Sequence, residues 1–334
     1  MRLRRSDPAR AGFTRRGSGR GFRYLDREGN AVAAPDRERI RAMAIPPAWR
    51  EVWICPWPNG HIQATGLDDA GRRQYLYHDQ WRRRRDAEKF DRVVDLAPGL
   101  PDFRDVVAAD LGSSGNTCRR ALAVALRMLD HGVFRVGGEE YVEQHGTYGA
   151  ATLLREQVGV RRGSVTFDFP AKGNIARAFT IPDAPLAKAV AGLRRARPDS
   201  DRLLVYRDGG AWHELHAEDV NMRFKEIVGQ RYTVKDLRTW NATVLAAAEL
   251  AATPGVRSQR AAKRTEAAMF RTVAEHLGNT PAIARKSYVD PRLIDKFERG
   301  ETIADFLDRV DDVDLADAEL RCSVERAVCA LLSA

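Results

Sequence analysis

The chain has 334 residues, and its 55 Lys and Arg residues outnumber its 46 Asp and Glu residues, giving a formal charge of +9. With 44% hydrophobic and 30% charged residues it can bury a core and is not disordered overall, and its length predicts two domains. The basic balance favours an anionic partner, nucleic acid before a membrane surface, although an ordinary basic soluble protein has the same composition.

The sequence lacks the signals of export and of metal binding. No apolar run approaches 18 residues, and the Arg-rich N-terminus has no apolar signal segment. The four cysteines form no Cys-x-x-Cys pair, and no His/Cys cluster has zinc spacing. We therefore expect a cytoplasmic, nucleoid-associated protein with reduced thiols, no metal site and no membrane segment.

The N-terminal part predicts a basic arm followed by a small sheet. Residues 1–23 are rich in arginine and glycine, which is typical of a flexible arm that lies along phosphates or is merely solvated. Residues 22–78 hold short, aromatic-rich alternating runs separated by turn signals such as Asn59-Gly60, which predicts antiparallel strands, with a short helix at residues 37–43.

A helical period begins at Asp79 and stops before Ala97-Pro98-Gly99-Leu100-Pro101, which has the composition of a linker. Beyond it, helices are expected at 103–111, at 117–131 and from 186 onward, with strands at 164–169 and 176–181 and a further strand at 203–206. We therefore predict an α+β protein with a β-rich N-terminal domain (1–97) and a larger, mostly helical domain with a small hairpin (98–334).

One tyrosine, Tyr288, stands among cations in Ala284-Arg285-Lys286-Ser287-Tyr288-Val289-Asp290-Pro291. A neutral phenol is a poor nucleophile because its pKa is about 10, but neighbouring cations favour the phenolate and stabilise a phosphate that it attacks. Most tyrosines in Arg-rich segments are ordinary surface or core residues. The segment indicates phosphoryl transfer only in company with other motifs.

Five motifs together resemble the type IB DNA topoisomerases of the compact poxvirus and bacterial kind. They occur in the order and spacing of that family, from about residue 22 to 300: Gly71-Arg72-Arg73-Gln74-Tyr75-Leu76-Tyr77, Phe134-Arg135-Val136-Gly137, the hairpin lysine Lys172, Lys235-Asp236-Leu237-Arg238-Thr239, and Gly278-Asn279-Thr280-Pro281 leading to Tyr288. The resemblance implies two lobes that clamp duplex DNA and a monomeric enzyme without a cofactor.

The resemblance also implies a role for each catalytic position. Tyr288 matches the nucleophile that forms a 3′-phosphotyrosyl link, after which supercoils relax and the strand is resealed. Arg135 and Arg238 match the arginines that hold the non-bridging oxygens, and Lys172 matches the lysine that protonates the leaving 5′-oxygen. Asn279 stands where many members have histidine, so it can donate a hydrogen bond but cannot act as a general acid.

Several further residues are expected to contact DNA. Tyr75 and Tyr77 alternate on one strand and face the same way, on a segment that lies in the major groove in the family, unless one of them packs against Trp53 or Trp57. Arg73 and Lys235 are expected phosphate contacts, which give affinity without sequence information. The expected DNA-contacting residues are Arg73, Gln74, Tyr75, Tyr77, Tyr141, Gln144 and Lys235.

Simpler roles stay open for the same positions. Arg135 could pair with Glu139 or Glu140, Arg238 could pair with Asp236 or cap a helix, Lys172 could be an ordinary hairpin lysine, and His276 is expected to be structural. A tyrosine recombinase shares the Arg/Lys/Tyr chemistry, but would carry a helical N-terminal domain instead of a sheet. A non-catalytic, basic DNA-binding protein is the third alternative.

Overall fold

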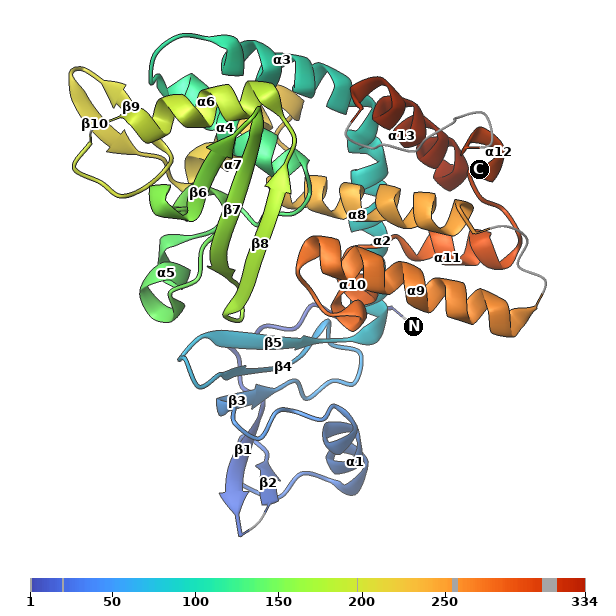
Figure 1. Ribbon diagram of the computed structural model, residues 1–334. Coiled ribbons are helices and arrows are strands. Elements are labelled where there is room, and N and C mark those ends of the chain that lie inside the picture. Colours follow the sequence, from blue (N-terminus) through green and yellow to red (C-terminus); the bar gives the residue numbers. More distant parts are fainter. Residues whose placement is uncertain (1, 20, 197, 254–257, 308–316, 334) are drawn as a thin grey trace. The chain divides into compact units, whose positions relative to one another are not determined.

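The computed structural model describes residues 2–19, 21–196, 198–253, 258–307 and 317–333 (Figure 1). The chain forms two compact units, Met1–Lys89 and Phe90–Ala334, which divide within helix α2 (Asp79–Leu96). The domain bounds 1–97 and 98–334 stay a prediction.

The first unit is built around one antiparallel sheet. Its strand order is β2-β1-β3-β4-β5, as the alternating N-terminal runs predict. The strands are β1 (Phe13–Ser18), β2 (Gly21–Leu25), β3 (Arg50–Ile54), β4 (Ile62–Leu67) and β5 (Arg73–Tyr77). The short helix expected at 37–43 is α1 (Ala34–Ala42), and its Ile40 packs into a small apolar core with Ile54 and Ala64.

The prediction of a flexible arm over residues 1–23 is wrong. The Arg4 backbone N–H donates to the Asn59 carbonyl (2.8 Å), and Ser6 is buried with its hydroxyl bound to the Ile62 carbonyl (2.9 Å). Strand β1 pairs with both β2 and β3 in the sheet.

Arg15 shows why these strands were not predicted from the sequence. Its guanidinium donates to the carbonyls of Ile45 (3.3 Å) and Pro46 (3.0 Å) and lies over the Phe22 ring. An arginine that binds main-chain carbonyls reads in the sequence as a solvated cation.

The linker predicted at residues 97–101 is also wrong. The stretch forms a short 3₁₀ helix, η1 (Ala97–Gly99), and the first turn of α3 (Leu100–Gly112), and both Ala97 and Leu100 are buried. Both helices carry a proline at one of their first two positions. A proline there loses no hydrogen bond, so the Pro and Gly residues mark two helix starts instead of a loop.

The second unit is mostly helical. Helix α4 (Cys118–Asp130) and helix α8 (Val234–Ala251) are buried along most of their length, and Leu126 and Trp240 lie in one large apolar core. The remaining helices are α5 (Glu139–His145), η2 (Ala150–Thr152), η3 (Arg155–Gln157), α6 (Ala184–Arg195), α7 (Ala217–Val228), α9 (Gln259–Leu277), α10 (Pro281–Ser287), α11 (Pro291–Glu298), α12 (Ala304–Leu307) and α13 (Ala318–Ser333).

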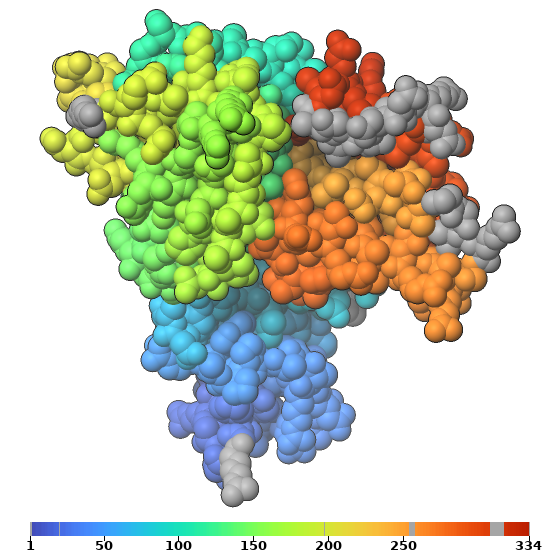
Figure 2. Space-filling model, in the orientation of Figure 1, coloured from blue at the N-terminus to red at the C-terminus, as the bar shows by residue number. Residues whose placement is uncertain are grey.

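Two small sheets complete the second unit. One has the order β6-β7-β8, with β6 (Val158–Arg161), β7 (Ser164–Ala171) and β8 (Ile175–Ile181), and the other pairs β9 (Val205–Asp208) with β10 (Ala211–Glu214). Figure 2 shows the light-green surface of the β7–β8 hairpin directly against the orange surface of α9 and α10. The predicted α+β class, a sheet domain followed by a mostly helical domain with small sheets, is confirmed. Within the described residues, no helix is both long and apolar enough to cross a membrane.

Candidate active site

The segment that carries Arg135 is anchored by aromatic packing and by two glycines. The Phe134 ring packs against Phe167 (4.9 Å between centroids) and Phe179 (5.3 Å), which belong to the β7–β8 hairpin. Gly137 has a φ of +80°, and a Cβ on it would lie 2.8 Å from the Cα of Gly149. The motif therefore needs glycine where two backbones touch, and this contact fixes the segment that presents Arg135.

Helix α8 begins at the second basic motif. Asp236 accepts a hydrogen bond from the Thr233 backbone N–H (2.8 Å) and pairs with Arg92 (2.8 Å), so it caps the helix. Arg238 then lies inside the molecule with 5% of its surface exposed, while Lys235 is exposed in the same first turn. The pairing of Arg238 with Asp236, left open by the sequence, is not what the structure shows.

The Arg238 guanidinium binds main-chain carbonyls instead of a carboxylate. One terminal nitrogen donates to the carbonyls of Gly132 (2.8 Å) and Phe134 (3.1 Å), and the other donates to the carbonyl of Leu277. The acceptors lie beside Arg135 and at the last residue of α9. Arg238 therefore joins two of the recognised motifs while keeping its charge unneutralised.

The end of α9 leads directly to the tyrosine. Gly278 caps the helix in the left-handed conformation (φ +60°), Asn279 follows, and Thr280 accepts the Ile283 backbone N–H (3.3 Å) to start α10. Tyr288 follows the last residue of α10, and its carbonyl accepts a hydrogen bond from Thr243 on α8 (3.3 Å). The short helix α10 explains the spacing between Asn279 and Tyr288.

The structure brings four of the five predicted catalytic residues together, and the fifth, Lys172, lies on the neighbouring hairpin. Arg135 donates a hydrogen bond to the Asn279 side-chain oxygen, and Arg238 lies over the Tyr288 ring at 5.4 Å. Lys172, exposed near the tip of the β7–β8 hairpin, lines a small cavity together with Arg135. Among the described residues, Arg135 makes no ion pair with Glu139 or Glu140.

The charges of this cluster act on the phenol. Burial alone would raise the pKa of Tyr288, but the charges of Arg238 and Arg135 and hydrogen bonding from Arg238 and Asn279 outweigh it, so the phenol pKa is lowered. Burial, and then the charge of Arg135, lowers the pKa of Arg238 to about 10. Lowered pKa values for both the phenol and the guanidinium indicate an excess of positive charge in a partly desolvated site.

Two donors in the cluster lack a well-aligned acceptor. Among the described residues, the Arg238 Nε and the Asn279 Nδ2 are buried without a partner of good hydrogen-bond geometry, although both side chains lie near enough to Tyr288 to lower its pKa. Buried donors without an acceptor are uncommon because desolvation costs about 1–3 kcal/mol each. Two of them beside one phenol point to an anionic group that they would bind.

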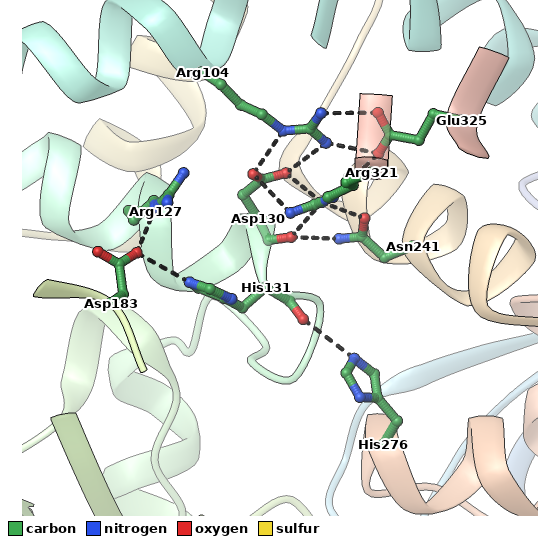
Figure 3. Close-up of polar contacts among 9 residues, drawn as sticks. All are labelled: Arg104, Arg127, Asp130, His131, Asp183, Asn241, His276, Arg321 and Glu325. Carbon is green, nitrogen blue, oxygen red and sulfur yellow. Dashed lines mark hydrogen bonds and ion pairs between the residues drawn. The ribbon is translucent and has the colours of Figure 1, made fainter. Parts of the chain in front are cut away.

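His276 has a structural position. Its Nε2 lies 3.1 Å from the His131 carbonyl oxygen, and burial lowers its pKa to about 4 (Figure 3). The ring is therefore neutral near pH 7 and ties the end of α9 to the turn before Arg135. This arrangement agrees with the structural role expected for it.

A cluster of buried ion pairs supports the same turn from behind. Asp130, the last residue of α4, pairs with Arg104 of α3 (2.9 Å) and with Arg321 of α13 (2.9 Å), as Figure 3 shows. Glu325 completes the cluster by pairing with Arg104 (2.7 Å). The backbone turn from Asp130 toward Arg135 is therefore held by the C-terminal helix.

The other predicted DNA-contacting residues are mostly exposed and lie on β5, on α5 and at the start of α8. Tyr75 and Tyr77 on β5 are 43% and 38% exposed and stack with 6.0 Å between centroids, so neither is buried against a tryptophan. Arg73 is exposed on the same strand, and Gln74 donates to Asp68 (2.9 Å). In the second unit, Tyr141 is 43% exposed on α5, where Gln144 binds Glu140. Their roles in DNA binding stay predictions.

Sequence reasoning missed one residue of the cluster, Arg177. It lies on β8, lines the same small cavity as Arg135 and Lys172, and binds the end of α9. Burial and the charge of Arg135 lower its pKa. The sequence feature that could have indicated it is an arginine five positions after Lys172, in the second strand of the hairpin.

Comparisons with known proteins agree with this geometry. The family described as "Eukaryotic DNA topoisomerase I, catalytic core" matches residues 78–310, and "Bacterial DNA topoisomerase IB, N-terminal domain" matches residues 21–68. DNA topoisomerase 1B of Acanthamoeba polyphaga mimivirus is 30% identical over 287 residues, covering 83% of this chain and 85% of that protein. The chain belongs to the type IB DNA topoisomerase family.

More distant members of the family match over a shorter span. DNA topoisomerase 1B of vaccinia virus (strain Copenhagen) is 22% identical over 69% of this chain and 71% of its own. Among solved structures, the XerH site-specific recombinase bound to difH substrate is 15% identical over 70% of this chain and 58% of its own, with a TM-score of 0.35, which does not establish a common fold. The chain is thus an isomerase of the type IB kind with a bacterial-type N-terminal domain, and duplex DNA is the substrate that this family implies.

Proposed function

We propose that this type IB topoisomerase relaxes supercoiled DNA by transient cleavage of one strand through a 3′-phosphotyrosyl intermediate at Tyr288, without ATP or a metal ion. The observation that carries the proposal is the position of Tyr288, whose ring faces Arg238 while Arg135 binds the neighbouring Asn279. Among the described residues, no carboxylate forms an ion pair with either arginine, and their charges lower the pKa of the phenol. An isolated structural tyrosine needs no such surroundings.

In the cleavage step, the Tyr288 Oη loses its proton to solvent and forms a bond to phosphorus. The bond between phosphorus and the 5′-oxygen breaks, and Lys172 supplies a proton to the leaving oxygen. An alkoxide is too basic to leave unaided, so a proton donor of this kind contributes roughly 10²–10⁴-fold to the rate. Resealing is the reverse of these steps, so the phosphotyrosyl bond keeps the energy that ATP would otherwise supply.

The arginines would stabilise the pentavalent state. Negative charge gathers on the equatorial oxygens, and catalysis of phosphoryl transfer is mostly positioning and electrostatic stabilisation. The Arg238 Nε and Asn279 Nδ2, which have no well-aligned acceptor among the described residues, are the donors that such oxygens would accept from. Arg238 is held by three carbonyls, so it would need no rearrangement when charge develops.

We further propose that the enzyme acts as a monomer on DNA in the cytoplasm, with no cofactor and with two lobes closing around the duplex. The stacked Tyr75 and Tyr77 offer an exposed aromatic surface, and Arg73 and Lys235 would contact phosphates. Tyr141 and Gln144 would lie near the scissile strand. The clamp itself is carried by the family resemblance and stays a prediction.

A relaxation assay tests the proposal. Supercoiled plasmid is incubated with the enzyme in EDTA without ATP, and relaxation is expected for the wild type and lost in Tyr288→Phe, which keeps the ring but removes the nucleophile. Tyr206→Phe, a half-buried tyrosine on β9 outside the site, is the matched control and should stay active. Binding without relaxation by the wild type would instead favour a DNA-binding protein, and strand exchange between two sites would favour a recombinase.

A further inference from the structure

Arg177 joins the hairpin that carries Lys172 to the helix that leads to Tyr288. One terminal guanidinium nitrogen donates to the Glu275 carbonyl (2.7 Å) and the other donates to the His276 carbonyl (2.8 Å). Both carbonyls belong to the last turn of α9, where the Glu275 carbonyl also accepts a hydrogen bond from the Gly278 backbone N–H (3.1 Å). A guanidinium that bridges two successive carbonyls fixes the orientation of the hairpin relative to α9 as well as the distance between them.

The end of α9 is shared between two arginines from different elements. Arg177 of β8 binds the Glu275 and His276 carbonyls, and Arg238 of α8 binds the next one, at Leu277. A helix C-terminus carries a partial negative charge of about half an elementary charge, so it attracts cations without neutralising them. The helix end therefore gathers cations immediately before Asn279.

The backbone at this place is shaped to admit Arg177. Gly278 has a φ of +60°, and a Cβ on it would lie 3.2 Å from the Cδ, Cζ and Nε atoms of Arg177. A side chain at position 278 would be strained by its conformation and would push on the guanidinium. The glycine of the Gly278-Asn279 motif thus serves the helix cap and the contact with β8 together.

On its own strand, Arg177 is held next to the lysine. It pairs with Phe169 across the β7–β8 ladder, its guanidinium lies 5.3 Å from the Phe179 ring centroid, and it lines the cavity that Lys172 and Arg135 also line. Among the described residues, no carboxylate forms an ion pair with Arg177. Its hydrogen bonds therefore orient the hairpin without cancelling the positive charge of the site.

We propose that Arg177 is a positioning residue that docks the β7–β8 hairpin on the end of α9 and so aims Lys172 at the 5′-oxygen of the scissile phosphate. The inference rests on the proposed function, because it assigns Arg177 an effect only through the proton that Lys172 supplies. Without the dock, an exposed lysine at a hairpin tip would sample many positions, and a misplacement of about 1 Å can cost about 10²-fold in rate.

A change of leaving group tests this directly. The cleavage site of the wild-type enzyme is mapped on duplex DNA, and the bridging 5′-oxygen at that site is replaced by sulfur. A thiol has a pKa of about 8.5, so a thiolate leaves without the proton that an alkoxide requires. The rate of covalent adduct formation in a single turnover is measured on the oxygen and sulfur substrates, and the ratio of the two rates reports proton donation.

We expect Arg177→Ala to slow cleavage of the oxygen substrate about 10²-fold and to approach the wild-type rate on the sulfur substrate. Lys172→Ala should show the same pattern with a larger defect, and Arg177→Lys should be intermediate because an ammonium cannot bridge two carbonyls as a fork does. Arg161→Ala removes an exposed cation from β6 of the same sheet and should leave both rates unchanged.

Two results would overturn the inference, and they differ from failure of the proposed function. If Lys172→Ala is rescued by sulfur but Arg177→Ala is not, then Arg177 acts on the phosphate or on folding and not through the lysine. A wild-type rate for Arg177→Ala on the oxygen substrate would show that the contact between Arg177 and α9 is dispensable.

If sulfur does not rescue Lys172→Ala itself, the proposed role of Lys172 fails and the inference falls with it. Thermal unfolding of each variant is compared with wild type, and the Arg177→Lys ratio replaces that of Arg177→Ala if the latter does not fold.

Discussion

Two clusters of arginine lie in the same unit of this protein and differ in whether carboxylates neutralise their charge. In the first, Arg104 and Arg321 face two carboxylates, Asp130 and Glu325, at distances of 2.7 to 3.3 Å. In the second, Arg135, Arg177 and Arg238 face an amide oxygen and main-chain carbonyls. The side-chain type is the same, but only the first cluster is electrically balanced.

The difference is visible in the pKa values. Burial opposes the charge of Arg104, but Asp130 and Glu325 outweigh it and raise its pKa, while the two arginines hold the pKa of the Asp130 carboxyl far below its usual range. In the second cluster, burial and neighbouring cations lower the pKa values of Arg177 and Arg238. Removing one member of a balanced buried cluster leaves an uncompensated charge, whereas an unbalanced buried cluster is typical of a site that binds an anion.

The two clusters are joined through one backbone turn. The Asp130 carbonyl accepts hydrogen bonds from Arg321 (2.8 Å) and Asn241 (2.9 Å), and the His131 carbonyl faces His276 (Figure 3). The next carbonyl, of Gly132, accepts from Arg238. The balanced cluster therefore supports the turn on which the unbalanced cluster rests.

The largest effect is expected from removing an arginine of the unbalanced cluster. Arg238→Ala should slow covalent cleavage about 10²–10³-fold, because the transition-state charge loses a fixed donor, while DNA binding is retained. Adduct formation in a single turnover and DNA binding by fluorescence anisotropy measure the two effects. Arg161→Ala serves as the matched control, and an unchanged cleavage rate in Arg238→Ala would remove Arg238 from the site.

The balanced cluster should respond in stability. Asp130→Asn keeps the shape but leaves Arg104 and Arg321 to share one buried carboxylate, Glu325, so the buried positive charge is no longer balanced. We expect a loss of about 3–5 kcal/mol in the free energy of unfolding. Urea unfolding followed by circular dichroism measures it, and Asp95→Asn, which breaks an exposed pair with Arg231, should change little. A wild-type unfolding free energy for Asp130→Asn would mean that the cluster is not structural.

The direction in which stability changes with pH follows from the pKa of Asp130. The folded pKa of Asp130 is lowered, so its stabilising contribution is fully present above the unfolded pKa of about 3.9 and is lost as the pH falls toward the folded pKa. Wild type should therefore lose stability below about pH 4 more steeply than Asp130→Asn, which has no carboxyl to protonate at this position.

The smallest expected effect comes from adding one carboxylate to the unbalanced cluster. The wild-type cleavage rate should rise with pH through a value below the ordinary tyrosine pKa of about 10, because the phenolate is the nucleophile. Asn279→Asp places a negative charge beside Arg135 and Tyr288, so the midpoint should move upward and cleavage at pH 7 should slow at least tenfold, roughly one pKa unit. Asn279→His keeps a donor without negative charge and should not raise the midpoint. An unmoved profile in Asn279→Asp would show that the cations do not control the phenol.

The sequence predicted the sheet, the helical domain and the residues that gather around Tyr288, because their order and spacing are those of a family. It could not predict that Arg238 would bind the carbonyls of Gly132 and Phe134, since main-chain acceptors carry no sequence signature. Arg177 was missed for the same reason. The false linker at residues 97–101 arose because proline and glycine mark helix starts as well as loops.

We propose that unbalanced arginine charge makes Tyr288 the group that becomes bonded to DNA. The most direct measurement is to trap the enzyme on a cleaved duplex, digest the adduct with trypsin and identify the modified peptide by mass spectrometry. We predict a peptide containing Tyr288 joined to a 3′-phosphate. A link through another side chain, or to a 5′-phosphate, would contradict the account.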